Sequence, residues 1–282
     1  MRRQVKGEAV RHELVPGESK ELLQALHLLT RDGDLNADSL RKLKQVNHLV
    51  GLLAPAIHDV LERFGDPVLV DCGAGKGYLG FILYELFLKN IAKGRLLALE
   101  TRPDLTATAR EVATRLGFGR MEIQAAAIDV AELPERVHLV TALHACDTAT
   151  DDALALAVRH NADHVALVPC CQAEVARQLA LEKGTDPAVL TLCERPWHRR
   201  ELGSHLTNVV RALVLEAKGY KVTVTELTGW EHSLKNELIL AKKVRARSVD
   251  AEEKLATLLV AAGVAPKAAR LLGLAPTSPA TA

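Results

Sequence analysis

Apolar residues recur at three- and four-residue spacing over most of residues 18–63, in "ESKELLQALHLLT" and "DSLRKLKQVNHLVGLLAPAIHDVLERF". This period corresponds to one face of an α-helix and predicts helices here. The intervening "NADS" supplies side chains that cap helix N-termini. We therefore expect residues 1–64 to form a helical N-terminal extension.

After "GDP" (65–67) the pattern changes to short apolar runs that alternate with amphipathic stretches. Such runs predict buried strands, and the amphipathic stretches predict helices. Strand–helix alternation favours a parallel sheet with helices on both faces. The apolar runs are "PVLVDC", "RLLALE", "MEIQAAAI", "RVHLVTAL" and "HVALVPC", and the helical stretches are 78–90, 103–116, 150–160 and 172–182.

The alternation stops after a predicted helix at 204–218. "YKVTVTEL" and "NELILAKKV" then follow one another across a short polar region. Two strands without a helix between them pair antiparallel at the sheet edge or leave the sheet. The sequence thus predicts an α/β domain over 65–246, a seven-stranded, mostly parallel sheet with a C-terminal antiparallel hairpin. Two short helices and a frayed tail are expected over 247–282.

Composition and charge say more about the cellular compartment of the protein than about its function. Hydrophobic residues make up 48% of the chain, and the formal net charge is +1, so no global charge draws the protein to nucleic acid or membrane. Basic islands occur in "MRRQVKGEAVRH", "RPWHRR" and "AKKVRAR", and such islands are often solvated surface. No apolar run approaches membrane-spanning length, the N-terminus lacks a signal-peptide core, and five cysteines show no disulfide framework. We expect a reduced, cytoplasmic setting.

Three glycines stand close together in "LVDCGAGKGYLGFIL" (69–83), between the first predicted strand and its helix. Glycine lets the backbone approach a ligand closely, and ligands of open parallel sheets bind beyond the carboxyl ends of the strands. A dinucleotide fingerprint, G-x-G-x-x-G, would need its third glycine where Tyr78 stands. The spacing Gly73, Gly75, Gly77 therefore argues against a nicotinamide enzyme.

"DCGAGKG" instead resembles the nucleotide-site motif of S-adenosylmethionine-dependent methyltransferases of the class I, Rossmann-like fold. In that family an acidic residue ending the second strand binds the ribose hydroxyls, and here "LLALE" ends in Glu100. A carboxylate suits ribose because it accepts two hydrogen bonds in a fixed geometry. An acidic residue after the third strand often lies near the adenine, a position that Asp129 matches, although aspartate is also a common helix cap. The resemblance implies cofactor binding by Asp71, Gly73, Ala74, Gly75, Gly77, Glu100, Asp129 and His144.

A narrower resemblance rests on "LHACDTATDDALALAV" (143–158) and "VALVPCCQ" (165–172). The pair is similar to a subfamily that includes the eukaryotic tRNA 2′-O-methyltransferase and bacterial methyltransferase-domain proteins. The bacterial proteins also share "KQVNH" (44–48) and "EHSLKN" (231–236), so the likeness spans about 40–243. This chain has Asp147 where the tRNA enzyme has glycine and Gln172 where it has histidine, and it lacks that enzyme's zinc modules.

Methyl transfer is an in-line displacement that depends mainly on alignment, and a general base assists only a protonated acceptor. We expect the acceptor side at the carboxyl ends of the fourth and fifth strands, with His144, Asp147 and Lys235 as catalytic candidates. For His144 the alternative is a buried histidine that holds the loop. Asp151 and Asp152 fit first-turn helix charges better than catalysis. Further candidates are Glu231, His232 and Asn236 on the hairpin, and Asn47 and His48 on the N-terminal helix.

No metal is expected. Adjacent cysteines such as Cys170 and Cys171 seldom ligate one ion in tetrahedral geometry, and paired C-x-x-C spacing is absent. We expect these two and Cys146 to pack beneath the cofactor as small, polarizable side chains.

The expected function is methyl transfer from S-adenosylmethionine to an acceptor, with RNA (tRNA or rRNA) ahead of protein. The RNA expectation rests on the basic islands, the N-terminal extension and the tRNA-enzyme resemblance. The 3% aromatic content counts against single-stranded RNA, which stacks on aromatic rings. A small-molecule acceptor and a non-catalytic S-adenosylmethionine-binding module remain alternatives, and the oligomeric state is open.

Overall fold

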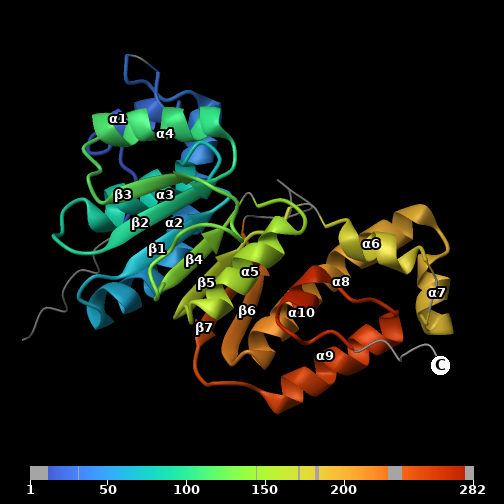
Figure 1. The fold of residues 1–282 in the computed structure, drawn as a ribbon. Helices are drawn as coiled ribbons and strands as arrows, with labels where there is room; N and C mark the ends of the chain where they lie inside the picture. The colour runs from blue at the N-terminus through green and yellow to red at the C-terminus, as the bar shows by residue number, and fades with distance from the viewer. Residues whose placement is uncertain are drawn as a thin grey trace, which may run out of the picture.

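The computed structural model describes residues 12–30, 32–143, 145–170, 172–181, 184–227 and 237–276. A central sheet lies between two layers of helices (Figure 1). Its strands are β1 (Val68–Cys72), β2 (Arg95–Glu100), β3 (Met121–Ala125), β4 (Leu139–Ala142), β5 (His164–Leu167), β6 (Tyr220–Glu226) and β7 (Glu237–Lys243). The helices are α1 (Lys20–Ala25), α2 (Ala37–Arg63), α3 (Tyr78–Leu83) continued by the π-helical η1 (Tyr84–Leu88), α4 (Pro103–Arg115), α5 (Ala149–Arg159), α6 (Glu174–Leu179), α7 (Pro187–Cys193), α8 (Pro196–Ala217), α9 (Val249–Ala262) and α10 (Lys267–Leu271).

The strand order is β3-β2-β1-β4-β5-β7-β6. The pairs from β3 to β5 are parallel, whereas β7 pairs antiparallel with both β5 and β6. The order reverses at β1, so the chain's first strand is central and the turn after it lies at a switch point. This is the Rossmann-like, mostly parallel, seven-stranded methyltransferase fold that the sequence predicts, with its antiparallel end pair.

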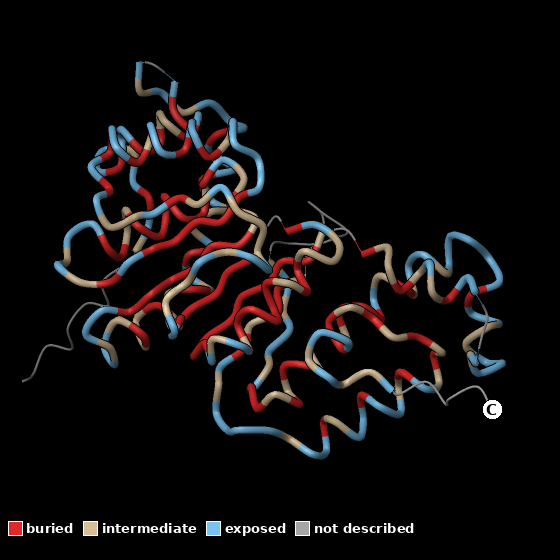
Figure 2. The backbone as a smooth tube through the Cα atoms, viewed as in Figure 1, coloured by how far each residue is buried: buried red, intermediate tan, exposed pale blue. Residues whose placement is uncertain are grey.

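Alternate residues of the strands face two separate cores. On β1, Leu69 belongs to the core under α2, α3 and α4, whereas Val68 and Val70 belong to the core under α5, α8, α9 and α10. Burial on both faces explains why the strands read as continuous apolar runs. Figure 2 shows this as a buried sheet between more exposed helices.

The N-terminal helix α2 shares the core of the sheet, with Leu53, Ile57 and Val60 among its fully buried residues. The Asn36 side chain caps it by accepting a hydrogen bond from the Ser39 N–H at 2.8 Å. The sequence pattern changes at residue 64, but the hydrophobic core continues across it because α2 packs against the sheet.

One expected helix has a different start in the structure, and one helix was not expected. The helix expected over 204–218 begins at Pro196, so the basic island "RPWHRR" forms its first turns, and α7 was not predicted. Both α7 and α8 begin with proline at N1, and Asp186 caps α7 by accepting from the Ala188 N–H at 2.8 Å. These local start signals identify the helices where apolar periodicity is weak. The two predicted C-terminal helices are confirmed as α9 and α10.

Candidate functional site

The glycine turn follows β1 directly and requires left-handed backbone. Gly73, Gly75 and Gly77 have φ of +67°, +58° and +80°, values that L side chains rarely adopt. A Cβ on Gly73 would lie 3.1 Å from the Cα of Ala145, and a Cβ on Gly77 would lie 2.9 Å from the Phe81 ring. The turn is thus packed against the β4 loop and against α3.

At Gly75 the situation differs, because a Cβ there would meet no atom within 4 Å. The backbone at Gly75 is therefore open on the side that a side chain would fill. An open, side-chain-free backbone at the carboxyl end of a central strand fits a ligand that lies flat against the turn. Ala74, between the first two glycines, is buried, and its N–H donates to the Leu99 carbonyl of β2 at 2.9 Å.

Glu100 ends β2 beside this turn, as the sequence predicts. Its carboxylate accepts hydrogen bonds from the Gly75 N–H at 2.9 Å and from the Arg102 N–H at 3.0 Å. Burial by itself would raise the pKa of Glu100, but these hydrogen bonds outweigh it and lower that pKa. Glu100 is thus held ionised next to the open backbone, and its predicted contact with ribose hydroxyls stays a prediction.

Asp71 lies deeper than Glu100, with only 3% of its surface exposed. Its Oδ1 accepts from the Thr141 hydroxyl of β4 at 2.8 Å, and the carboxylate also accepts from the Gly80 N–H of α3. Burial raises the pKa of Asp71 to about 6, although both hydrogen bonds act in the opposite direction. These contacts join β1, β4 and α3, so Asp71 holds the elements that shape the turn. Its predicted cofactor contact stays a prediction.

The remaining cofactor candidates are Asp129 and His144. Asp129 lies in the loop after β3, at the same edge of the sheet, and is exposed. His144 lies outside the described residues, as do the hairpin candidates Glu231, His232, Lys235 and Asn236. Their predicted roles stay predictions.

Asp147 connects the β4 and β5 loops. Its carboxylate accepts from the N–H of Ala173, the N-cap of α6, at 3.0 Å and from the guanidinium of Arg177, in the last turn of α6, at 3.2 Å. Burial would raise the pKa of Asp147, but these partners outweigh it and lower that pKa. Asp147 thus fixes the β4 loop to α6, and its predicted catalytic role stays a prediction.

The backbone of Asp147 has a conformation that few side chains adopt. Asp147 has φ of +50°, in the left-handed region. Glycine adopts that conformation without cost, and aspartate is among the few other residues enriched there. Asp147 therefore preserves the loop conformation that a glycine would allow and adds a carboxylate that ties α6 to it.

A buried polar network, which sequence reasoning missed, supports these loops from α8. Arg211 is fully buried and donates to Asp151 at 2.7 Å and to the Asp147 carbonyl at 2.7 Å. Burial raises the pKa of Asp151, although Arg211 acts in the opposite direction. Asn208, one turn earlier, accepts from Gln172 at 3.1 Å and donates to Glu237 at 2.9 Å. The available signal was a polar pair three residues apart within the apolar stripe of α8.

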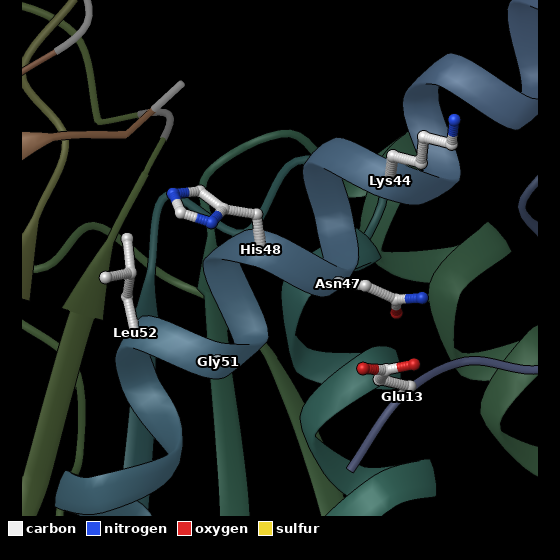
Figure 3. A pocket seen from close by; sticks show the side chains of 6 residues that line it. All are labelled: Glu13, Lys44, Asn47, His48, Gly51 and Leu52. Atoms are coloured by element: carbon white, nitrogen blue, oxygen red, sulfur yellow. The ribbon is translucent and has the colours of Figure 1, made fainter. Parts of the chain in front are cut away.

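The two N-terminal candidates, Asn47 and His48, have different surroundings on α2. Asn47 clamps the preceding segment, because its side chain accepts from the Leu14 N–H at 2.9 Å and donates to the Leu14 carbonyl at 3.2 Å. Figure 3 shows Asn47 beside Glu13, while His48 points away from both. These residues line a cavity of about 440 Å³, together with Lys44, Gly51 and Leu52. Asn47 is thus used in packing, and His48 is exposed.

The cysteines after β4 and β5 lie together. The Sγ atoms of Cys146 and Cys170 are 3.3 Å apart, and Cys171 lies outside the described residues. Within the described part of the chain, no three His, Cys, Asp or Glu side chains gather as a metal site would require. The same residues include no helix long and apolar enough to cross a membrane.

Solved structures with a similar chain path share little sequence with this protein. An rRNA methylase from Streptococcus thermophilus is 11% identical with a TM-score of 0.46, over 70% of this chain and 97% of that one. An S-adenosylhomocysteine-bound methyltransferase from Podospora anserina is 12% identical with a TM-score of 0.47, over 84% and 91%. The magnesium protoporphyrin IX methyltransferase from Synechocystis, with bound S-adenosylmethionine, is 12% identical with a TM-score of 0.41, over 80% and 90%.

No curated protein matches the chain. A family model described as a methyltransferase domain matches residues 41–178, just under half of the chain. The match runs from α2 into α6 and includes the glycine turn, Glu100, Asp129 and Asp147. It supports a methyltransferase domain over the segment that forms the candidate site.

Proposed function

We propose that this protein transfers a methyl group from S-adenosylmethionine to an acceptor at the carboxyl edge of β4 and β5. The observation that carries the proposal is the open backbone at Gly75 with the ionised Glu100 carboxylate fixed beside it. When bound, S-adenosylmethionine supplies a methyl group on a sulfonium, which is already a good leaving group. Glu100 would bind the ribose hydroxyls, and the glycine turn would lie against the methionine part.

The contribution of this chain to the reaction is alignment and exclusion of water. Gly73 packs against Ala145, which brings the start of the β4 loop onto the glycine turn. Asp147 and Arg211 then fix that loop against α6 and α8. A nucleophile held by these loops meets the donor in a defined direction, which is the main requirement of an in-line displacement.

The sequence leaves the acceptor class open and places RNA ahead of protein and of small molecules, and a cytoplasmic setting is part of the same proposal. The first part of α8 offers one feature in favour of RNA, because Arg195 and Arg200 are exposed beside Trp197, itself 62% exposed. Exposed aromatic rings with basic neighbours are a usual means of holding unstacked bases. An acidic groove that begins at the same helix favours a cation instead. The narrower likeness to the tRNA 2′-O-methyltransferase remains part of this proposal.

The test is calorimetric binding of S-adenosylhomocysteine to the protein and to a Glu100→Ala variant. Loss of a charged hydrogen-bond acceptor should weaken binding about tenfold or more. Glu111→Ala, on the exposed side of α4, is the matched control and should bind as the wild type does. Absence of binding to the wild-type protein would refute the proposal.

If the donor binds, transfer of a labelled methyl group to RNA and to protein fractions compares the acceptor classes. Labelled RNA whose yield falls as salt rises would support phosphate contacts and an RNA acceptor. Labelled protein without labelled RNA would refute the RNA acceptor and leave methyl transfer itself in place.

A further inference from the structure

A groove of about 920 Å³ runs between α8 and the end of the β6–β7 hairpin. Residues on α8 form one wall, and Val224, Thr225 and Glu226 of β6 with Glu237 of β7 form the other. Pro169 and Gln172, which follow β5, close the end nearest the centre of the sheet. None of the roles derived above accounts for this groove as a whole.

The groove opens at the edge of the sheet that carries the glycine turn. The end of the groove nearest the turn lies at β5, which is the second strand from β1 in the sheet order. Because neighbouring strands lie about 4.8 Å apart, this end of the groove is roughly 10 Å from the turn. Its floor is rigid, because Gln172 and Ser204 are hydrogen-bonded at 2.9 Å and Asn208 holds Glu237 at 2.9 Å. An acceptor held here would be presented toward β4 and β5.

The charge of the lining is negative. Four glutamates and one arginine line the groove, along with the exposed His205: the carboxylates are Glu201, Glu216, Glu226 and Glu237, and the guanidinium is that of Arg200. Arg200 is already engaged with Glu201, at 3.5 Å between Nε and Oε1. A polyphosphate would be repelled by this lining, whereas a cation would be attracted.

Two of the glutamates directly face one another. Glu226 and Glu237 are partners in the β6–β7 register, at the carboxyl edge. Like charges directly opposite each other destabilise a strand pair. A cation bound between these side chains would remove that cost, so the pair favours a positively charged occupant.

Trp197 adds an aromatic surface to the lining of the groove. The Arg200 guanidinium lies 4.2 Å from the centre of its ring, so the ring already accepts a cation in the protein itself. An indole stacks on bases as well as on cations, and the negative lining decides between the two.

We propose that this groove binds the methyl acceptor as a cation, the ammonium group of a lysine-bearing segment of a partner protein. The proposal rests on the proposed methyl transfer and names protein, rather than RNA, as its substrate class. For transfer, the ammonium loses a proton to water, the nitrogen lone pair forms the new C–N bond, and the electron pair of the broken S–C bond stays on sulfur.

The experiment measures fluorescence anisotropy of a labelled peptide of alternating lysine and serine, added to the full-length protein. The same peptide with acetylated lysines and a labelled single-stranded RNA serve as comparison probes. A Glu226→Gln, Glu237→Gln double variant removes both facing charges while glutamine keeps a carbonyl acceptor for Asn208. Glu253→Gln, exposed on α9 outside the groove, is the control.

The lysine peptide should bind, the acetylated peptide should not, and the double variant should weaken binding about tenfold. Trp197→Ala should weaken it about threefold, and Glu253→Gln should leave it unchanged. Equal peptide binding by the double variant would overturn the proposal. So would RNA binding that the double variant strengthens, because the groove would then be an RNA site opposed by its carboxylates.

S-adenosylhomocysteine binding to the same variants separates this inference from the proposed function. If the donor product binds throughout while the peptide does not, the cationic acceptor is wrong and methyl transfer stands. If the donor product fails to bind even the wild type, the proposed function is wrong, and peptide binding still decides the groove's charge preference.

Discussion

Asp71 lies where burial and charge oppose one another within the sheet. Its carboxylate is 3% exposed and holds the Thr141 hydroxyl and the Gly80 N–H, yet burial raises its pKa to about 6. Replacing it with asparagine keeps the shape and removes the charge. The amide oxygen can accept from Gly80, and the amide NH₂ can donate to the Thr141 oxygen, so both hydrogen bonds have a substitute.

The magnitude follows from the shift of the pKa of Asp71 from 3.8 to about 6. One pKa unit corresponds to about 1.4 kcal/mol, so the folded state loses up to about 3 kcal/mol relative to the unfolded state when this group ionises. The folded state of the wild type is therefore favoured when Asp71 is protonated. This contribution to the free energy of unfolding is fully present below pH 4 and is lost as the pH rises through 6. Asp71→Asn should lack this loss.

The assay is urea unfolding of the wild type and of Asp71→Asn at several pH values between 4 and 8. The difference in the free energy of unfolding between the two proteins should change by up to about 3 kcal/mol, in favour of the variant at the higher pH. Asp104→Asn, at the exposed start of α4, controls for the loss of one negative charge. A wild-type-to-variant difference that is constant over this range would refute the reasoning, because Asp71 would then titrate alike in both states.

Two further predictions concern the glycine turn and the buried network. Gly73→Ala should destabilise the fold by about 2 kcal/mol and abolish S-adenosylhomocysteine binding, because the new Cβ would crowd Ala145 and the residue would also bear the cost of left-handed φ. Gly117→Ala, the control, bears only the φ cost. Thermal unfolding measures the loss of stability and calorimetry measures binding; equal losses of stability in the two variants would contradict the packing argument. Arg211→Met should cost about 3–5 kcal/mol in urea unfolding by stranding the buried Asp151 carboxylate. Adding Asp151→Leu should recover part of that loss, and a double variant no more stable than the single one would show that the ion pair is not the cause.

Much of the fold follows from local pattern. Strands buried on both faces must be apolar throughout, and helices that cover them must be amphipathic, so the alternation after residue 65 predicts the parallel sheet, and its interruption predicts the β6–β7 pair. The left-handed turn at Gly73–Gly77 was predictable for the same reason, because only glycine adopts those dihedral angles freely. The position of Glu100 at the end of β2 was predictable from the apolar run before it, whereas its role came from the family resemblance and stays a prediction.

Tertiary structure decided what depends on contacts between distant segments. Nothing local to Asp147 shows that its carboxylate is used by α6, and nothing local to Asn208 or Arg211 shows which loops they hold. The groove beside α8 arises only when Glu226 and Glu237 come opposite one another across the hairpin. Periodicity and turn chemistry act over a few residues and are written in the sequence itself. Burial, pKa and charge complementarity depend on which segments the fold brings together.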